Sequence, residues 1–408
     1  MRILHTSDWH LGRTLHGVDL HAHHEAFLDH LVEVVRAEAV DAVLVAGDVY
    51  DRAVPPVASV ELLSDALARL TSLTRVVLTP GNHDSAARLG FGAGLYRDRL
   101  AVRSRVPGIG TPVLLPEDDG GPGALVYALP YLDPDMCRDA LTETDPGGEP
   151  VRPARSHEAV TGAALRRVRR DLAARRRSGG TRQPAVVMAH AFVVGGQPSE
   201  SERDIRVGGV DSVPAGVFAD VPGAGELSAL DYVALGHLHG PQRVGTADLA
   251  GPQMRYAGSP LAYSFSERHH HKSTAVIELS EDGVRSVRLV EAPTPRRLSE
   301  VAGTLAELLG PVTEDRTEDW VRVAVTDDVR PSEMYAQVRR RFPHALVVQH
   351  RPARGTERTD ALTVHAAQDP VTVAEEFVRT AGGRPPEAAE RTVLRQAYER
   401  VLSTGRSA

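Results

Sequence analysis

Five short, mainly apolar runs of this chain end in side chains that can bind a metal ion. They read RILHTSDWH, DAVLVAGD, TRVVLTPGNHD, PAVVMAH and DYVALGHLH. Apolar runs of this length indicate strands buried on both faces of a sheet. Binding sites of open α/β sheets form at the carboxyl ends of the strands, where loops from several strands converge. The five runs therefore predict a sheet whose polar strand ends meet in one place.

The polar side chains at these strand ends provide a mixed set of nitrogen and oxygen ligands. Seven protein ligands are too many for one ion but suit two, provided that one carboxylate bridges the ions, which lie about 3.5–4 Å apart in two-metal hydrolytic sites. Asp48 is the natural bridge, because it is the lone carboxylate of its strand. Ligands of this kind, without thiolates, favour manganese, iron or zinc over calcium and magnesium. The candidate ligands are Asp8, His10, Asp48, Asn82, His190, His237 and His239.

The HLH sequence at residues 237 to 239 suggests how one strand serves both ions. Residues i and i+2 of an extended strand face the same side, about 6–7 Å apart. His237 and His239 are therefore expected to point together, one towards each ion, and Asp8 and His10 have the same spacing. A solvated strand end is the alternative for any single run, but five similar ends argue against it. Three glycines stand where the backbone must approach a crowded centre: Gly47, Gly81 and Gly236.

The charge of such a site favours an anionic substrate. Two divalent cations against two aspartates leave an excess of about two positive charges, which suits a phosphodiester. The whole chain has a formal net charge of −7 and does not by itself indicate a nucleic-acid binder. Residues 165–182 are strongly basic and expected to be helical up to a glycine pair; they either supply local positive charge for DNA or form a solvated helix face. The predicted reaction is metal-assisted hydrolysis of a phosphate ester.

Strands that alternate with helices predict an α/β sheet in the first part of the chain. Helices are expected at 21–39 and 57–73, and the runs MRYAGSP, STAVIEL and VRSVRLV after residue 245 suggest a second sheet beside the first. The first helix is expected to have one apolar face, and the second has apolar residues at helical spacing: Phe27, Leu31, Val34 and Val35 in the first, and Val60, Leu63, Leu67 and Leu70 in the second.

The segment EAPTPRR is expected to be a linker to a smaller α/β unit, which two terminal helices follow. In the smaller unit, residues 300–309 and 332–341 are expected to be helical, and WVRVAV and HALVVQH to be extended. The chain has one cysteine, Cys137, which excludes an internal disulfide. No run is long enough to span a membrane, and the N-terminus does not resemble a signal peptide, so a cytoplasmic protein is expected.

The motifs SDWH, GDVYD, GNHD and GHLH, with the histidine of MAH, resemble those of the calcineurin-like metallophosphoesterase superfamily. The stretches SDWHLGR, GDVYDRAVPP, SESERDIRVGG, DYVALGHLHGPQ and YAGSPLAYSFSE narrow the resemblance to the SbcD family of bacterial nuclease subunits. The resemblance covers most of residues 1–275. It implies an α/β fold with two sheets in an αββα metallophosphoesterase sandwich over residues 1–280, a smaller α/β cap domain that binds DNA over 296–368, and C-terminal helices over 369–408.

The resemblance also implies how two manganese ions share the ligands. Asp8, His10, Asp48 and His239 would hold one ion, and Asp48, Asn82, His190 and His237 the other. His83 matches the catalytic histidine of the family, which stabilises the transition state and protonates the leaving oxygen; an extra ligand or a structural residue is the alternative. Asp84 is expected to orient its neighbours. Asp51 is assigned no catalytic role, because some relatives carry histidine there.

Substrates and partners follow from the same resemblance. The family cuts double-stranded DNA ends as a 3′–5′ exonuclease, and single strands or hairpins as an endonuclease, in DNA repair, recombination and replication. A homodimer bound to two SbcC ATPase subunits is implied, associated with the nucleoid through DNA, with the terminal helices docked on SbcC. An apolar stripe suits such docking, although a helix packed on its own domain explains it equally: Val393, Leu394, Ala397, Tyr398, Val401 and Leu402.

Two other functions stay open at this point. One is a small-molecule phosphodiesterase or phosphatase of the same superfamily, and the other is a non-catalytic scaffold that binds DNA ends. The phosphatases of the superfamily usually have an arginine just before the Gly-Asn-His turn, where this chain has Thr79 and Pro80. An intact ligand set together with His83 argues against a scaffold.

Overall fold

The computed structural model describes residues 1–96, 98–116, 123–145, 147–178, 181–205, 212–219, 226–245, 251–352, 370–382 and 384–405. These residues form two compact units. The first contains residues 1–300, 315–322 and 342–347, and the second contains residues 301–314, 323–341 and 348–408. Among the helices described, none combines the length and the apolar composition that crossing a bilayer requires.

The first sheet has the strand order β18-β17-β1-β4-β5-β6. Strands β1, β4, β5 and β6 run parallel, whereas β17 is antiparallel to β1 and β18 is antiparallel to β17. All five residues of β4 are buried, as expected for a central strand covered on both faces. The bounds are β1 (Arg2–Thr6), β4 (Ala42–Ala46), β5 (Arg75–Thr79), β6 (Leu100–Val102), β17 (Ser273–Ser280) and β18 (Gly283–Glu291).

The second sheet has the order β15-β16-β14-β11-β8-β7. Strands β8, β11, β14 and β16 are parallel, and an antiparallel strand closes each edge. The bounds are β7 (Val113–Leu115), β8 (Ala124–Ala128), β11 (Ala185–His190), β14 (Tyr232–Gly236), β15 (Gln242–Val244) and β16 (Gln253–Tyr256).

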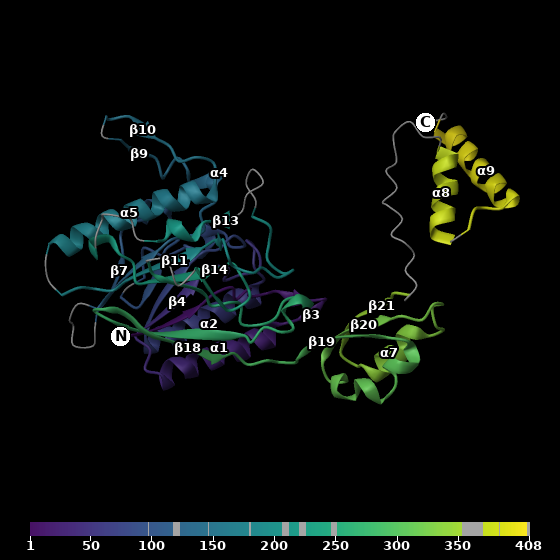
Figure 1. Cartoon of the computed structure of the whole chain (residues 1–408), viewed down its shortest axis with the longest axis horizontal. Coiled ribbons are helices and arrows are strands. Elements are labelled where there is room, and N and C mark those ends of the chain that lie inside the picture. Colours follow the sequence, from purple (N-terminus) through teal and green to yellow (C-terminus); the bar gives the residue numbers. More distant parts are fainter. Residues whose placement is uncertain are drawn as a thin grey trace. The chain divides into compact units, whose positions relative to one another are not determined.

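The two sheets pack face to face, and helices cover both outer faces (Figure 1). Alternation along each strand produces this arrangement: Leu44 packs between the sheets against Met188, whereas Val43 and Val45 pack on the other side with Phe27. Helices α1 (His21–Ala37) and α2 (Val57–Leu73) cover the first sheet, and α5 (His157–Arg177) covers the second. The predicted αββα sandwich is confirmed.

The predicted membership of the sheets is wrong in one respect. Strands β17 and β18, which contain STAVIEL and VRSVRLV, extend the first sheet rather than forming a second one. The second sheet takes β11 and β14, which were expected beside β4, and β16, which contains part of MRYAGSP. Ile3 pairs with Ile277 across 274 residues of sequence, and periodicity along one strand carries no information about such a partner.

The helix predictions hold for α1, where Phe27, Leu31, Val34 and Val35 are all buried. On α2, Leu63 and Leu70 are buried, but Val60 is exposed. Short elements occupy the connections: β2 (Thr14–Leu15), β3 (Val18–Asp19), α3 (Ala86–Leu89), α4 (Pro134–Cys137), β9 (Glu143–Thr144), β10 (Pro150–Val151), β12 (Phe192–Val193) and β13 (Ser212–Val213).

Residues 298–350 contain a three-stranded sheet, β19 (Leu298–Gly303), β20 (Trp320–Val325) and β21 (Ala345–His350), with α6 (Leu305–Leu308) and α7 (Met334–Arg341). The expected helix over 300–309 is wrong for its first part, because residues 300–303 belong to β19. Two terminal helices are present as predicted, α8 (Pro370–Gly382) and α9 (Ala388–Gly405). The boundary expected at 368 and the side chains of Tyr398, Val401 and Leu402 lie outside what the structure describes.

Candidate metal centre

The seven predicted ligands meet where strands of both sheets end. The first sheet contributes the loops after β1, β4 and β5, and the second contributes the end of β11 and the loop after β14. Short distances connect the two groups: His10 Nε2 lies 3.1 Å from His239 Nε2, and Asn82 Oδ1 lies 2.9 Å from His190 Nε2. His237 turns Nδ1 to within 3.3 Å of the same Asn82 oxygen, and its main-chain N–H donates to Asp8. The sandwich therefore places all seven side chains in one cluster.

Asp48 lies between two groups of imidazoles. One carboxylate oxygen, Oδ2, is 3.6 Å from His10 Nε2 and 3.4 Å from His190 Nε2. The other, Oδ1, accepts a hydrogen bond from the main-chain N–H of His83 at 2.9 Å, which fixes the orientation of the carboxylate. One oxygen within reach of both groups is the geometry that a bridging ligand requires.

The histidines after β14 reach the centre by a route that differs from the predicted one. The strand ends at Gly236, so the HLH sequence lies beyond it, and His237 has a φ of 105°. Asp8 and His10 follow β1 with φ values of 53° and 47°. These angles lie in the sparsely populated left-handed region, which costs side chains other than glycine about 1–3 kcal/mol. Turns in a strained backbone, and not the alternation of a strand, aim these side chains.

The three predicted glycines stand where other atoms come too close to the backbone for a side chain to fit. A Cβ at Gly47 would lie 2.2 Å from His190 Nδ1, and one at Gly81 would lie 2.1 Å from Asp48 Oδ1. At Gly236 it would lie 1.8 Å from the carbonyl oxygen of Ala46. The ligands and the opposing backbone occupy the space that any larger residue needs.

Hydrogen bonds determine which ring nitrogen faces the centre. His190 Nδ1 is 3.1 Å from the carbonyl oxygen of Ala46, and His83 Nδ1 is 2.7 Å from that of Asp51. A carbonyl oxygen only accepts, so each Nδ1 carries a proton, and Nε2 is the nitrogen that faces the centre. Nε2 of His190 points to Asp48 and Asn82. Half-buried His83 stacks edge-on against His10, with ring centroids 4.7 Å apart.

This donor set fits a divalent cation. Three groups of carboxylates and imidazoles, all buried except half-buried His83, hold their donor atoms within 4.8 Å of one another: Asp8, His10 and His239; His10, Asp48 and His83; Asp8, Asp48 and His190. Ring nitrogens and carboxylate oxygens converge here: His10 Nε2 lies 3.1 Å from His239 Nε2 and 3.6 Å from Asp48 Oδ2. A cation satisfies such groups where no donor does. His83 stays near enough to leave the extra-ligand alternative open.

Comparisons with known proteins agree with this geometry. The calcineurin-like phosphoesterase family matches residues 1–241, and the type 5 capsule protein repressor C-terminal domain matches residues 294–381. The D subunit of the SbcCD nuclease of Rhodobacter capsulatus is 38% identical over 308 residues, covering 72% of this chain and 70% of that protein. The protein of the same name from Escherichia coli K12 is 29% identical over 416 residues, covering 99% of this chain and 98% of that protein.

The chain belongs to the SbcD family of calcineurin-like phosphoesterases. The resemblance of the motifs is thereby confirmed. Among solved structures, TT1561 of Thermus thermophilus aligns with a TM-score of 0.38 and 14% identity, covering 71% of this chain and 98% of that chain.

Burial and neighbouring charges shift the pKa values of the seven candidate ligands. Burial raises the pKa of Asp8 to about 7. Burial, with an added effect of His190, lowers the pKa of His237 to about 3. Burial also acts to lower the pKa of His190, but the Asp48 carboxylate outweighs burial and raises that pKa to about 9. In the reverse direction, burial acts to raise the pKa of Asp48, and His190 brings it well below the ordinary value. Without a cation, a proton on His190 therefore balances Asp48.

Two aspartates beside the candidate ligands, Asp84 and Asp51, hold the loops that follow β4 and β5. Asp84 accepts hydrogen bonds from the main-chain N–H groups of Val49, Tyr50 and Gly81, which confirms its expected orienting role. Asp51, to which sequence reasoning assigned nothing, lies 3.5 Å from His10 Nδ1 through its side chain and holds His83 through its carbonyl group. The repeated aspartate of GDVYD was the available signal for it.

The basic segment on α5 is largely occupied within its own domain. Arg166 and Arg170 both pair with Glu143, and Arg175 pairs with Asp171. Other arginines of the helix donate to main-chain carbonyl groups: Arg167 to Ala140 and Thr142, Arg169 to Val217 and Ala219, and Arg176 to Ala229 and Gln183. These contacts explain six arginines of the helix without DNA.

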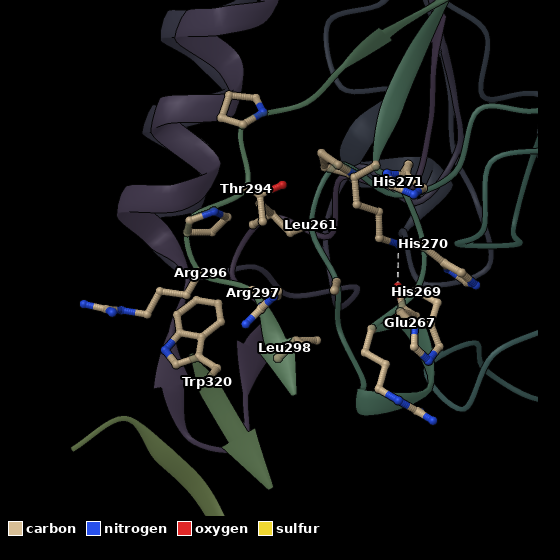
Figure 2. Close-up of a pocket in the computed structure, with 16 residues that line it drawn as sticks. Leu261, Glu267, His269, His270, His271, Thr294, Arg296, Arg297, Leu298 and Trp320 are labelled. Atoms are coloured by element: carbon tan, nitrogen blue, oxygen red, sulfur yellow. Dashed lines mark hydrogen bonds and ion pairs between the residues drawn. The ribbon is translucent and has the colours of Figure 1, made fainter. Parts of the chain in front are cut away.

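Four further residues behave as ordinary parts of the fold. Trp9 is buried, donates to Thr6 at 2.9 Å and packs edge-on against Phe27 in the core between the first sheet and its helices. Cys137 is buried, and burial raises the pKa of its thiol to about 12. His269 and His271 of the RHHHKS run are exposed loop residues that line a separate cavity of about 340 Å³, which Figure 2 shows.

Proposed function

We propose that this protein is a two-metal DNA nuclease that hydrolyses phosphodiester bonds within an SbcCD complex. The observation that carries the proposal is the position of Asp48, one oxygen of which is within 3.6 Å of His10 and 3.4 Å of His190. A shared carboxylate between two groups of imidazoles is what a two-metal site needs and what a structural single-metal site does not. The relatives' name, which describes them as part of the SbcCD nuclease, supports the choice of substrate.

The proposed ions are Mn²⁺, because histidine, carboxylate and amide donors without thiolates suit this metal. We assign the first ion to Asp8, His10, Asp48 and His239, and the second to Asp48, Asn82, His190 and His237. Such cations, when bound, polarise a phosphoryl oxygen and lower the pKa of water.

His83 is proposed as the catalytic residue. Its Nδ1 donates to the Asp51 carbonyl group, so Nε2 is the nitrogen available to a substrate. Its ring is half-buried beside His10 and is therefore reachable from solvent, unlike the fully buried rings of the ligands. In this role Nε2 stabilises charge on the phosphate and delivers a proton to the leaving oxygen. The Asp51 carbonyl keeps the other nitrogen protonated throughout.

The cap around α7 is proposed to contact the DNA backbone. Arg339 and Arg340 on this helix are exposed and therefore available to phosphates, in contrast to the paired arginines of α5. The family's double-stranded ends and hairpins are the expected substrates. These arginines supply positive charge that a chain of net charge −7 lacks overall.

The terminal helices are proposed to dock on SbcC. Helices α8 and α9 both expose large apolar side chains, with Phe377 exposed by 65% and Val393 by 63%. Such side chains on amphipathic helices suit a groove on a partner. A complex of two copies of this chain with two SbcC subunits follows if a homodimer forms.

The proposed homodimer uses the surface formed by the outer side of α2 and the segment from α3 to Leu95. Phe91 is exposed by 83% and Leu95 by 78%. Val60 of α2 lines a cavity of about 870 Å³ together with Phe91, and Val57 of the same helix is also exposed. An apolar surface of this extent on a soluble protein indicates an interface. A second copy of the chain fits it, because identical apolar patches complement each other across a twofold axis.

The test of the function uses purified protein, Mn²⁺ and end-labelled duplex DNA. Wild type is expected to degrade the duplex, a chelator to abolish the reaction, and His83→Ala to reduce the rate at least about 100-fold while still binding metal. A p-nitrophenyl phosphodiester serves as the small substrate. Cleavage of this ester with intact DNA, even after SbcC is added, would contradict the proposal and identify a small-molecule phosphoesterase.

A further inference from the structure

A buried polar network lies behind His239, on the side away from the other ligands. The main-chain N–H of His239 donates to Glu202 at 2.8 Å, and its carbonyl oxygen accepts from Lys272 Nζ at 2.8 Å. Its ring Nδ1 is 2.5 Å from the hydroxyl oxygen of Ser201. Both the backbone and the ring of this residue are therefore held by side chains from two other segments.

The direction of the hydrogen bonds in this network is determined by Glu267. Its Oε1 accepts from the Ser201 hydroxyl at 2.6 Å and from the main-chain N–H of Tyr263 at 3.0 Å, and its Oε2 accepts from Lys272 at 2.5 Å. Figure 2 shows Glu267 at the edge of the adjacent cavity, where a dashed line marks the ion pair. A carboxylate has no proton to donate, so the single Ser201 proton points to Glu267. The Ser201 oxygen can then only accept, and the proton of the His239 ring lies on Nδ1.

We propose that Ser201 and Glu267 are positioning residues that hold His239 in the tautomer whose Nε2 can bind a divalent cation. This nitrogen faces His10 Nε2 at 3.1 Å, within the group formed by Asp8, His10 and His239. The inference rests on the proposed function, because it requires His239 to be a metal ligand. Partners behind a ligand histidine, such as a carboxylate, orient the ring and raise its basicity. Here the Ser201 hydroxyl group connects the Glu267 carboxylate to the His239 ring through two hydrogen bonds, which form a relay.

Lys272 anchors the far end of this relay. Of the 47 lysines and arginines of the chain, it is the single lysine, and its side chain is buried. Its ammonium group contacts three acceptors: the His239 carbonyl oxygen, Ser259 Oγ at 2.9 Å and Glu267. The three N–H donors of a compact ammonium group can reach three acceptors in different directions. The guanidinium group of an arginine is planar and presents its donors in one fork, so it would fit this position less well. The ion pair keeps Glu267 charged and in place.

The test compares Ser201→Ala with Ser264→Ala. Both hydroxyl groups donate to Glu267 Oε1, at 2.6 and 3.0 Å, and both are buried, but Ser264 bonds to Glu267 and Ser266, not to the His239 ring. The full-length proteins are titrated with Mn²⁺ alone by calorimetry. We expect Ser201→Ala to raise the Kd of one of two ions about 10- to 100-fold, and Ser264→Ala to leave both within about twofold. Ser201→Thr, which keeps the hydroxyl group, should restore the affinity.

Three results would overturn parts of this reasoning separately. Equal affinity in wild type and Ser201→Ala rejects the relay. Equal losses in Ser201→Ala and Ser264→Ala, or no recovery in Ser201→Thr, show a packing effect and also reject it. A wild-type protein that binds fewer than two ions contradicts the proposed function itself. Circular dichroism of each variant confirms that the comparison is between folded proteins.

Discussion

The ion pair of His190 and Asp48 makes metal binding depend on pH. Burial acts to lower the pKa of His190, but Asp48 raises it to about 9, so this ring carries a proton at pH 7 in the metal-free protein. A cation needs the free Nε2 and must displace that proton. We therefore expect the metal affinity to rise with pH up to about 9, by at most tenfold per unit for each proton released. Calorimetry in two buffers of different ionisation enthalpy measures the released protons directly.

The same pair affects the stability of the metal-free protein in the opposite sense. A folded-state pKa above the ordinary value of 6.5 means that the charged pair stabilises the fold fully below about pH 6.5 and loses this contribution as pH rises through about 9. Alkaline pH therefore favours the metal complex and disfavours the metal-free fold. A metal affinity that does not change between pH 7 and 9, with no proton release, contradicts this assignment of His190.

Gly81 offers a second test of the crowded centre. Gly81→Ala would place a Cβ 2.1 Å from Asp48 Oδ1, too close for both atoms, and should displace the carboxylate that we propose as the bridge. We expect at least about a tenfold loss of Mn²⁺ affinity and of phosphodiesterase activity. Gly108→Ala is the matched control, because nothing lies within 4 Å of a Cβ there and the backbone is unstrained. Retained activity in Gly81→Ala would show that the carboxylate does not need this position.

The clustering of the seven candidate ligands could be predicted from the sequence, but the geometry of the cluster could not. Asp8, His10 and His237 are aimed by backbone angles in the left-handed region, and no residue pattern signals such angles outside glycine. The hydrogen bonds from Glu267 through Ser201 to His239 could not be predicted from the sequence either. Its members Ser201 and Glu267 lie in different motifs, SESERD and YSFSE, and only the packing of the second sheet against its loops brings them within 2.6 Å.

At the scale of elements, helix α5 contains a glycine that the structure does not require. A Cβ at Gly162 would meet only the end of the Arg166 side chain, at 3.8 Å. Gly162→Ala should therefore stabilise this helix by about 0.5–1 kcal/mol, because alanine loses less backbone entropy on folding. Hydrogen exchange of α5 peptides, followed by mass spectrometry, should slow about two- to fivefold where exchange proceeds by local opening of the helix. Peptides of α1 are the internal control and should not change.

Element type was easier to predict than element partners. The apolar runs located β4, β5, β11 and β14 correctly, because a strand buried on both faces has a distinctive composition. Their division between two sheets depends on long-range pairing, which leaves no local trace. One error was avoidable: Thr304 and Glu307 form a capping box that starts α6, and this pattern in the sequence TLAE separates the helix from the preceding strand β19.

At the scale of the whole molecule, helix α2 has the predicted bounds, but it exposes one of the apolar residues that stand at helical spacing. Helical spacing grouped Val60 with Leu63 and Leu70, but Val60 is exposed while the two leucines pack on the first sheet. A helix with apolar residues on more than its buried face has a second surface to cover. The proposed homodimer interface covers it together with Phe91 and Leu95.

Phe91→Glu tests this interface. In a twofold dimer the substitution places two carboxylates in one apolar surface, which should cost at least about 2 kcal/mol and raise the dimer dissociation constant about 30-fold or more. Met136→Glu is the matched control, because Met136 lies on α4, away from this surface in sequence, and is exposed by the same 83%. Sedimentation at micromolar concentrations should show dimers for wild type and Met136→Glu, and monomers for Phe91→Glu. Dimers of Phe91→Glu with unchanged affinity would show that the copies associate through another surface, and a monomeric wild type would contradict the proposed homodimer.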